Sequence, residues 1–74
     1  MADFSFKIVE SFGVIEEGSK GWNTELNKVA WGEAAPKWDI RAWSPDHTKC
    51  GKGITLTDEG IRNLKTALGV AVMD

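Results

Sequence analysis

Two short stretches of the sequence combine large aromatic rings with cationic side chains at the spacing of β-strands. In residues 22–31 and 36–43, apolar and polar residues alternate, as they do in half-buried strands. Successive side chains of a strand point to opposite faces, so each stretch can present a ring beside polar groups. Exposed rings stack on unpaired bases, and cations hold phosphates. The residues that could form such a surface are Trp31, Lys37, Arg41 and Trp43.

The other face of the same two strands looks like an ordinary hydrophobic core. It carries Trp22, Leu26, Trp38 and Ile40, and large aromatic residues next to aliphatic ones are usually buried. The rings of the polar face have two alternative roles, in packing at the sheet edge or in a dimer contact.

Three further lysines extend the candidate surface. Lys52 lies between two glycines, which let a backbone pass close to a ligand or turn tightly. Lys20 and Lys28 are additional candidates for phosphate contact, with solubility as their alternative role. For Lys37 and Arg41, the alternative is an ion pair with Asp39, worth about 0.5 kcal/mol at a surface.

The charge of the chain is uneven. The net charge is −2, but residues 20–52 carry six bases against four acids. So small a local excess predicts binding to a polyanion in which stacking supplies much of the affinity.

The residues that could support catalysis or bind a metal are too few. His47 and Cys50 are three residues apart, but two ligands do not complete a tetrahedral zinc site. Glu25 and Asp39 lack any sign of a cleft that excludes water. We therefore expect neither an enzyme, nor a metal, nor a cofactor.

These residues must be positioned by a small set of elements. A first strand begins at Phe4 and is bent, or split in two, near Glu10. Residues 22–31 and 36–43 form a hairpin, and residues 52–57 form a last strand. Thr57 then caps a helix over residues 58–72, whose apolar stripe should pack on the sheet; it consists of Ile61, Leu64, Leu68 and Val72.

The length of 74 residues limits the chain to one domain, residues 1–74. A single cysteine and the lack of a signal or membrane segment predict a cytoplasmic protein. A core this small leaves little stability, so self-association is expected. Val70 and Met73 fall off the helix stripe and suggest a second apolar surface, which another copy of the helix could cover.

Several motifs occur in an order that is fairly specific to one family. They are Glu25-Leu-Asn, Trp31-Gly, the run PKWDIRAW over residues 36–43, and GKGITLT over residues 51–57 before a terminal helix. With them the chain resembles the C-terminal single-stranded-DNA-binding domain of the transcriptional coactivator positive-cofactor-four family. Its short bacterial YdbC-type members are the most similar.

That resemblance implies a four-stranded antiparallel sheet followed by one C-terminal helix, in a homodimer packed through the helices. It also implies that Trp31 stacks on bases and that Arg41, Trp43 and Lys52 line a channel, with Lys37 an approximate match. Two departures matter: Gly51 replaces a basic residue of eukaryotic members, and the serine-rich regulatory tail is absent.

We therefore expect a sequence-tolerant binder of single-stranded DNA, or of RNA, that acts in transcription regulation, replication or repair and could contact the transcription machinery. The alternative is a protein-interaction module that uses the exposed Trp and Arg face. Stacking on a carbohydrate or small aromatic ligand ranks last, since it leaves the cations unexplained.

Overall fold

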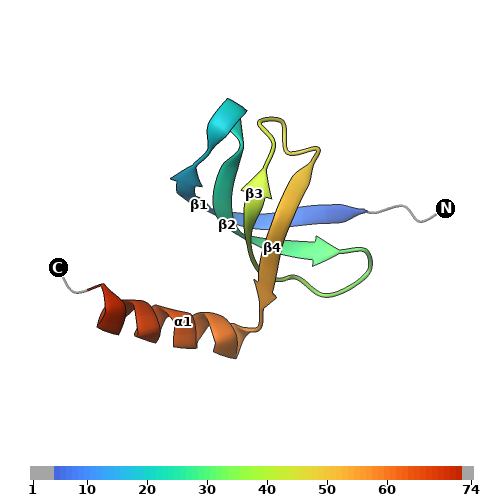
Figure 1. Ribbon diagram of the computed structural model, residues 1–74. Helices are drawn as coiled ribbons and strands as arrows, with labels where there is room; N and C mark the ends of the chain where they lie inside the picture. The colour runs from blue at the N-terminus through green and yellow to red at the C-terminus, as the bar shows by residue number, and fades with distance from the viewer. Residues whose placement is uncertain (1–4, 73–74) are drawn as a thin grey trace.

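The computed structural model describes residues 5–72. Four strands form one antiparallel sheet in which neighbours in the sheet are also neighbours in the chain, and one helix follows the last strand (Figure 1). The predicted α+β architecture is confirmed. In chain order the elements are β1 (Phe6–Glu17), the 3₁₀ turn η1 (Ser19–Gly21), β2 (Asn23–Trp31), β3 (Lys37–Trp43), β4 (Cys50–Leu56) and α1 (Asp58–Ala71).

The predicted alternation along β2 and β3 is also confirmed. Their register pairs Glu25 with Arg41 and Asn27 with Asp39, so these side chains share what we call the Trp31 face. Leu26 pairs with Ile40, and Lys28 with Trp38, on the opposite side, which we call the helix face.

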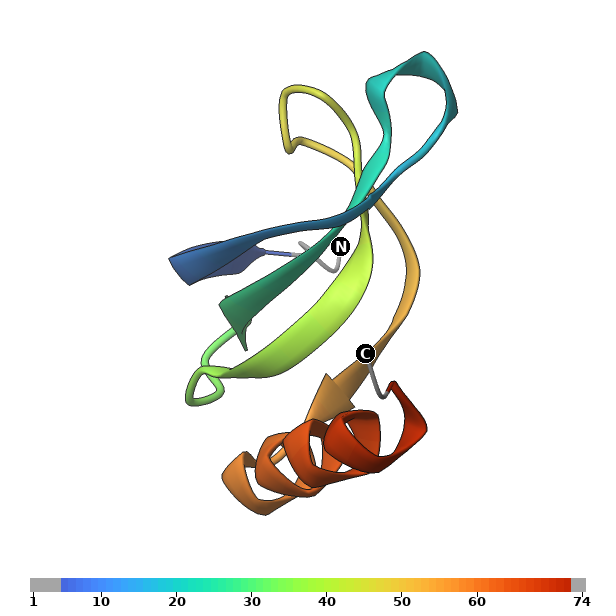
Figure 2. The same cartoon turned by 90° about the vertical axis from the view of Figure 1, so that its left-hand side faces the viewer.

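The deepest burial lies on the face that was expected to be exposed. The fully buried hydrophobic side chains among residues 5–72 are Val29 and Trp43, and Asn27 and Asp39 are equally inaccessible. Leu26 and Ile40 of the expected core are only half-buried. The expectation of an ordinary core on the helix face is therefore wrong. The sheet is strongly twisted (Figure 2). Two rings pack against Trp43: Phe6, which precedes it in the chain, and His47, which follows it.

Strand β1 is bent rather than split. Its register with β2 shifts between Ile8 and Glu10, between Ser11 and Gly13, and between Val14 and Glu16, so the twelve residues of β1 lie along only nine of β2, and three of the twelve have no partner in the register. Each bulge adds a residue and so changes which of the following side chains point to which face of the sheet. Phe6 accordingly contacts Trp31, whereas Phe12 stacks on Trp38 of the helix face. The predicted strand start at Phe4 lies outside the described residues.

Helix α1 begins as predicted. The Thr57 hydroxyl accepts a hydrogen bond from the Gly60 amide at 3.0 Å, and Asp58 and Glu59 occupy the first turn. The Trp38 indole donates to the Asp58 carboxylate at 2.7 Å and ties β3 to the start of the helix.

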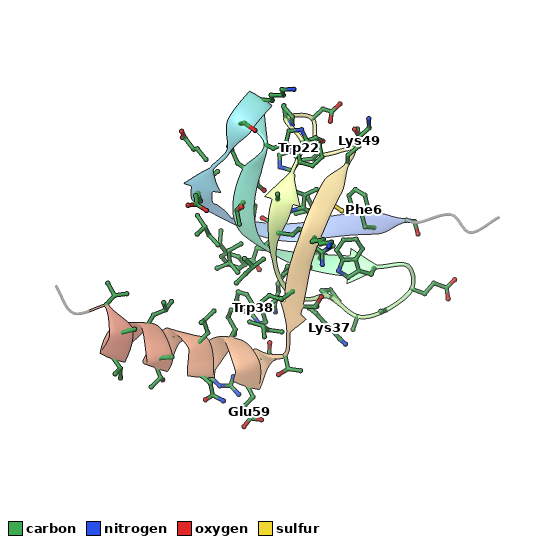
Figure 3. All side chains as sticks on the ribbon, viewed as in Figure 1. Phe6, Trp22, Lys37, Trp38, Lys49 and Glu59 are labelled. Carbon is green, nitrogen blue, oxygen red and sulfur yellow. The ribbon has the colours of Figure 1, made fainter. Side chains whose placement is uncertain are left out.

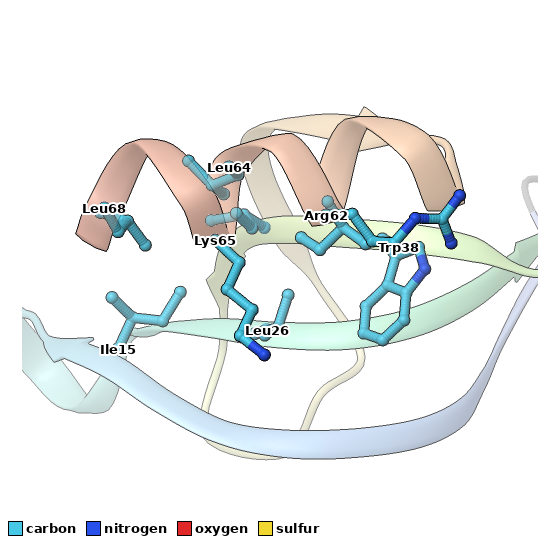
Figure 4. Close-up of a pocket in the computed structure, with 9 residues that line it drawn as sticks. Ile15, Leu26, Trp38, Arg62, Leu64, Lys65 and Leu68 are labelled. Carbon is cyan, nitrogen blue, oxygen red and sulfur yellow. The ribbon is translucent and has the colours of Figure 1, made fainter. Parts of the chain in front are cut away.

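The rest of α1 does not pack on the sheet as expected. The helix leaves the end of β4 and runs beside the sheet (Figure 1), so Leu68 is 51% exposed and Val72 60%. Between helix and strands lies an open apolar groove of about 740 Å³, which we call the helix groove (Figure 4). Its lining consists of Ile15, Leu26, Trp38, Ile40, Ile61, Arg62, Leu64, Lys65 and Leu68.

No helix among residues 5–72 is long and apolar enough to cross a membrane. Of the two apolar residues off the helix stripe, Val70 is 71% exposed, and Met73 lies outside the described residues.

Candidate nucleic-acid interface

The Trp31 face is organised around two indole rings. Those of Trp31 and Trp43 are nearly parallel, with an interplanar angle of 11° and centroids 6.4 Å apart. Phe6 of β1 tilts against both, at 5.7 Å from Trp31 and 5.1 Å from Trp43. The Arg41 guanidinium lies over the Trp31 ring, 4.7 Å from its centroid. Trp31 thus combines a stacking surface with an adjacent cation.

Arg41 is held by its own strand, β3, and by the neighbouring strand β4. Its Nε donates to the Asp39 carboxylate at 2.7 Å, and its Nη1 donates to the Gly51 carbonyl oxygen at 3.2 Å. The hydrogen bond to Asp39 raises the pKa of Arg41 above its usual value. Gly53 lets β4 approach this pair, because a Cβ there would collide with Arg41 and with the Ile40 carbonyl. Of the ion pairs with Asp39 that were the alternative for Lys37 and Arg41, the one with Arg41 forms.

A second polar group lies beside this pair. Glu25 accepts a hydrogen bond from the Asn27 side-chain amide at 3.1 Å, and its two carboxylate oxygens lie 2.9 and 3.1 Å from His47 Nε2. The imidazole of His47 also stacks on Trp43, with centroids 5.7 Å apart. The face is therefore not strongly basic, because Glu25 and Asp39 balance Lys37 and Arg41.

The loop after β3 fixes His47 in place. The Asp46 carboxylate accepts hydrogen bonds from the Thr48 amide, the Thr48 hydroxyl and the Ser44 hydroxyl. These bonds, the first from Thr48, lower the pKa of Asp46 to about 2. The His47 amide donates to the Ser44 carbonyl at 2.9 Å and adopts a left-handed φ of 60°. The loop is thus ordered by its own hydrogen bonds.

Three buried polar atoms of the Trp31 face have no hydrogen-bond partner among residues 5–72. They are Asn27 Oδ1, Asp39 Oδ2 and Trp43 Nε1. Most buried polar groups are satisfied, and exceptions concentrate at functional sites. This face is therefore unlike an ordinary packing core.

The structure brings together three of the seven predicted site residues, Trp31, Arg41 and Trp43. The Trp43 side chain is only 1% exposed, so the expectation that it offers a free ring is wrong. Phe6, Trp31 and His47 surround it. Trp43 packs inside the domain against Trp31.

The four predicted lysines are more scattered. Lys37 is exposed where β3 begins (Figure 3), and Lys52 is exposed on the edge strand β4. Lys20 lies in η1 with a left-handed φ of 58°. Lys28 places its ammonium 4.9 Å from the Trp38 ring centroid, on the helix face. The structure therefore separates Lys28 from the Trp31 cluster, because even-numbered residues of β2 point to the helix side.

Phe6 and His47 were not predicted as members of this cluster. The strand alternation places Glu25 on this face, but Glu25 and His47 are 22 residues apart in sequence, and no local pattern joins them. Among residues 5–72 no group of three or more His, Cys, Asp or Glu side chains could hold a metal ion.

The chain was also compared with known proteins. No family model matches it. A protein of Treponema pallidum (strain Nichols), described as "Uncharacterized protein", is 39% identical over 72 residues, which cover 97% of this chain and 85% of the relative. Similarity at this level over nearly the whole chain indicates common descent and a shared fold. The chain belongs to the same family as this Treponema protein.

Proposed function

We propose that this domain binds single-stranded DNA or RNA with little sequence preference, and that it does so as a homodimer in transcription regulation, replication or repair. The observation that carries the proposal is the Arg41 guanidinium stacked over Trp31 at 4.7 Å. Planar guanidinium and indole groups both stack on bases, and every base offers a π-face.

The supporting groups give this surface a fixed geometry. Trp43 and Phe6 pack against the Trp31 ring, and Asp39 fixes the guanidinium. Two of the five Arg41 N–H groups are used by Asp39 and Gly51, which leaves donors for a phosphate. Lys37 and Lys52 are exposed and add flexible charges.

The homodimer rests on the helix groove. This groove is apolar and open, Leu68 in its lining is half exposed, and Val72 just after the end of α1 is exposed as well. Exposed apolar surface of this extent marks an interface in a small protein, and the two fully buried hydrophobic residues of the described chain make a very small core. A second copy placing its own helix against the groove would cover the apolar side chains of the helix face and add a second core there.

Intrinsic tryptophan fluorescence tests the binding proposal. The protein is titrated with oligo-dT, oligo-U and a duplex of equal length at low and high salt. We expect the single strands to quench the emission, with weaker binding at high salt. A spectrum unchanged by all three ligands would contradict the proposal.

A protein-interaction module is the second candidate. It is favoured by the balance of Glu25 and Asp39 against the cations, since a neutral aromatic face suits a protein partner. Salt separates the two functions. Nucleic-acid binding weakens steeply with ionic strength, whereas an aromatic protein contact changes little.

A further inference from the structure

His47 approaches the Trp31 face from the loop after β3 and contacts two of its residues. Its Nε2 atom lies 2.9 and 3.1 Å from the oxygens of Glu25, and its ring stacks on Trp43. His47 is the one histidine of the chain. Its main chain is held at a left-handed φ of 60° by the loop. The imidazole is thus positioned, rather than free to swing into solvent.

The contact with His47 is the one that can balance the negative charge of Glu25. Its other side-chain partner is the neutral amide of Asn27, and the side chain is nearly buried on the proposed phosphate-binding face. Arg41 lies opposite Glu25 in the register, but its Nε is bonded to Asp39. A protonated His47 therefore neutralises Glu25, and a neutral His47 leaves one unpaired negative charge there.

Other charged groups occur on the loop of His47 and on the strands that flank the Trp31 face. On its own loop, Asp46 has a pKa lowered to about 2 by hydrogen bonds from Thr48 and Ser44, and it stays anionic. An imidazole is the ordinary side chain that changes charge between about pH 5 and 8. The remaining groups are Lys49 on the loop, Asp39 and Arg41 on β3, Cys50 of β4, which interacts with Arg41, and Glu17 of β1, opposite Asn23.

We propose that His47 is a positioning residue that couples single-strand binding to protonation. When the imidazole is charged, it cancels the negative charge of Glu25 and the single-stranded nucleic acid binds more tightly. When it is neutral, the Glu25 carboxylate repels phosphates. This inference rests on the proposed function and assigns its regulation to a single His and Glu pair.

The test measures the anisotropy of a labelled oligo-dT without a terminal phosphate, whose bases and diesters do not titrate near neutrality. For the wild-type protein, we expect binding roughly five-fold tighter at pH 5.5 than at pH 8. His47→Asn keeps the left-handed backbone favourable and should flatten the profile at the pH 8 level. Glu25→Gln should bind at pH 8 about as tightly as the wild type does at pH 5.5.

Glu59→Gln is the matched control. Glu59 is exposed on α1, far from the loop that carries Lys49 (Figure 3), and its loss should leave the pH profile unchanged. Circular dichroism at each pH checks folding, and His47→Gln replaces His47→Asn if the latter unfolds. A flat wild-type profile, or a slope that survives both His47 variants, overturns the inference while leaving the proposed function standing. Absence of binding at every pH overturns both.

Discussion

Arg41 has two roles, and a variant that removes its side chain would not separate them. Its guanidinium covers Trp31, and it also neutralises Asp39, whose side chain is fully buried. Removing the arginine would leave a buried carboxylate unpaired, which typically costs 3 to 5 kcal/mol. A loss of binding in such a variant would then report unfolding. The contribution of this surface to binding is better tested at Trp31 and at the exposed lysines.

Replacement of Trp31 tests the stacking surface. We expect Trp31→Ala to weaken oligo-dT binding about ten-fold, or roughly 1.4 kcal/mol, because the stacking surface that Trp31 forms with Arg41 is lost. Trp31→Phe keeps an aromatic face and should lose less. Anisotropy titrations measure the affinities, and thermal melts show whether each variant is folded. Equal affinity of a folded Trp31→Ala protein and the wild type would exclude stacking at this position.

Single lysine variants test which face meets the phosphates. Lys37→Ala and Lys52→Ala should each reduce the slope of log affinity against log salt by about 0.7, the value for one phosphate contact on a single strand. Lys28→Ala is the control, since Lys28 lies over Trp38 on the helix face, and its slope should match the wild type. If Lys28→Ala reduced the slope and the other two variants did not, the bound nucleic acid would lie on the helix face.

At the scale of elements, β4 depends on one of its two glycines. The sequence suggested that both let a partner approach the backbone, but the close contact at Gly53 is internal, with Arg41 and Ile40 of β3. Gly51 has more room, because its added Cβ would meet only the Ala42 Cβ, at 3.8 Å.

We therefore expect unequal effects of alanine at these glycines. Gly53→Ala should lower the free energy of unfolding by about 2 kcal/mol, since overpacking forces β4 away from β3. Gly51→Ala should change it by less than about 0.5 kcal/mol. Urea denaturation followed by tryptophan fluorescence measures both. Similar losses of unfolding free energy in the two variants would mean that the close approach of β3 and β4 at Gly53 does not set the cost of the added methyl group.

Helix α1 carries the test of the dimer. Leu68 lines the helix groove, so Leu68→Glu would place a carboxylate in an apolar interface and weaken self-association about a hundred-fold, given a cost of about 3 kcal/mol. Asn63→Glu adds the same charge at an exposed helix position outside the groove lining and serves as the control. Sedimentation velocity measures the oligomeric state. A wild-type protein that is monomeric at high concentration would contradict the homodimer.

At the scale of the whole molecule, local patterns in the sequence predicted the elements well. Alternation around Trp38 and Leu26 indicated the two strands and which residues share a face, and Thr57 with its following acids marked the start of the helix. These features depend on neighbours in the chain, so a single sequence contains them.

What could not be predicted depends on packing over long distances. The burial of Trp43 requires Phe6 and His47, which come from distant parts of the chain. The open groove depends on the direction in which α1 leaves β4, and the apolar stripe of Leu64 and Leu68 specifies a contact without specifying its partner. The stripe was read as packing within one copy, whereas its outer part is exposed.

The three bulges of β1 have a consequence for the solubility of the protein. β1 is an edge strand, and Val9, Phe12, Val14 and Ile15 on it are about half exposed. A regular apolar edge of this length would template pairing with strands of other molecules and growth into fibrils. Each bulge breaks the even spacing of the outward amide and carbonyl groups, so an incoming strand cannot pair along its length. The irregular strand thereby prevents this exposed apolar edge from nucleating aggregates.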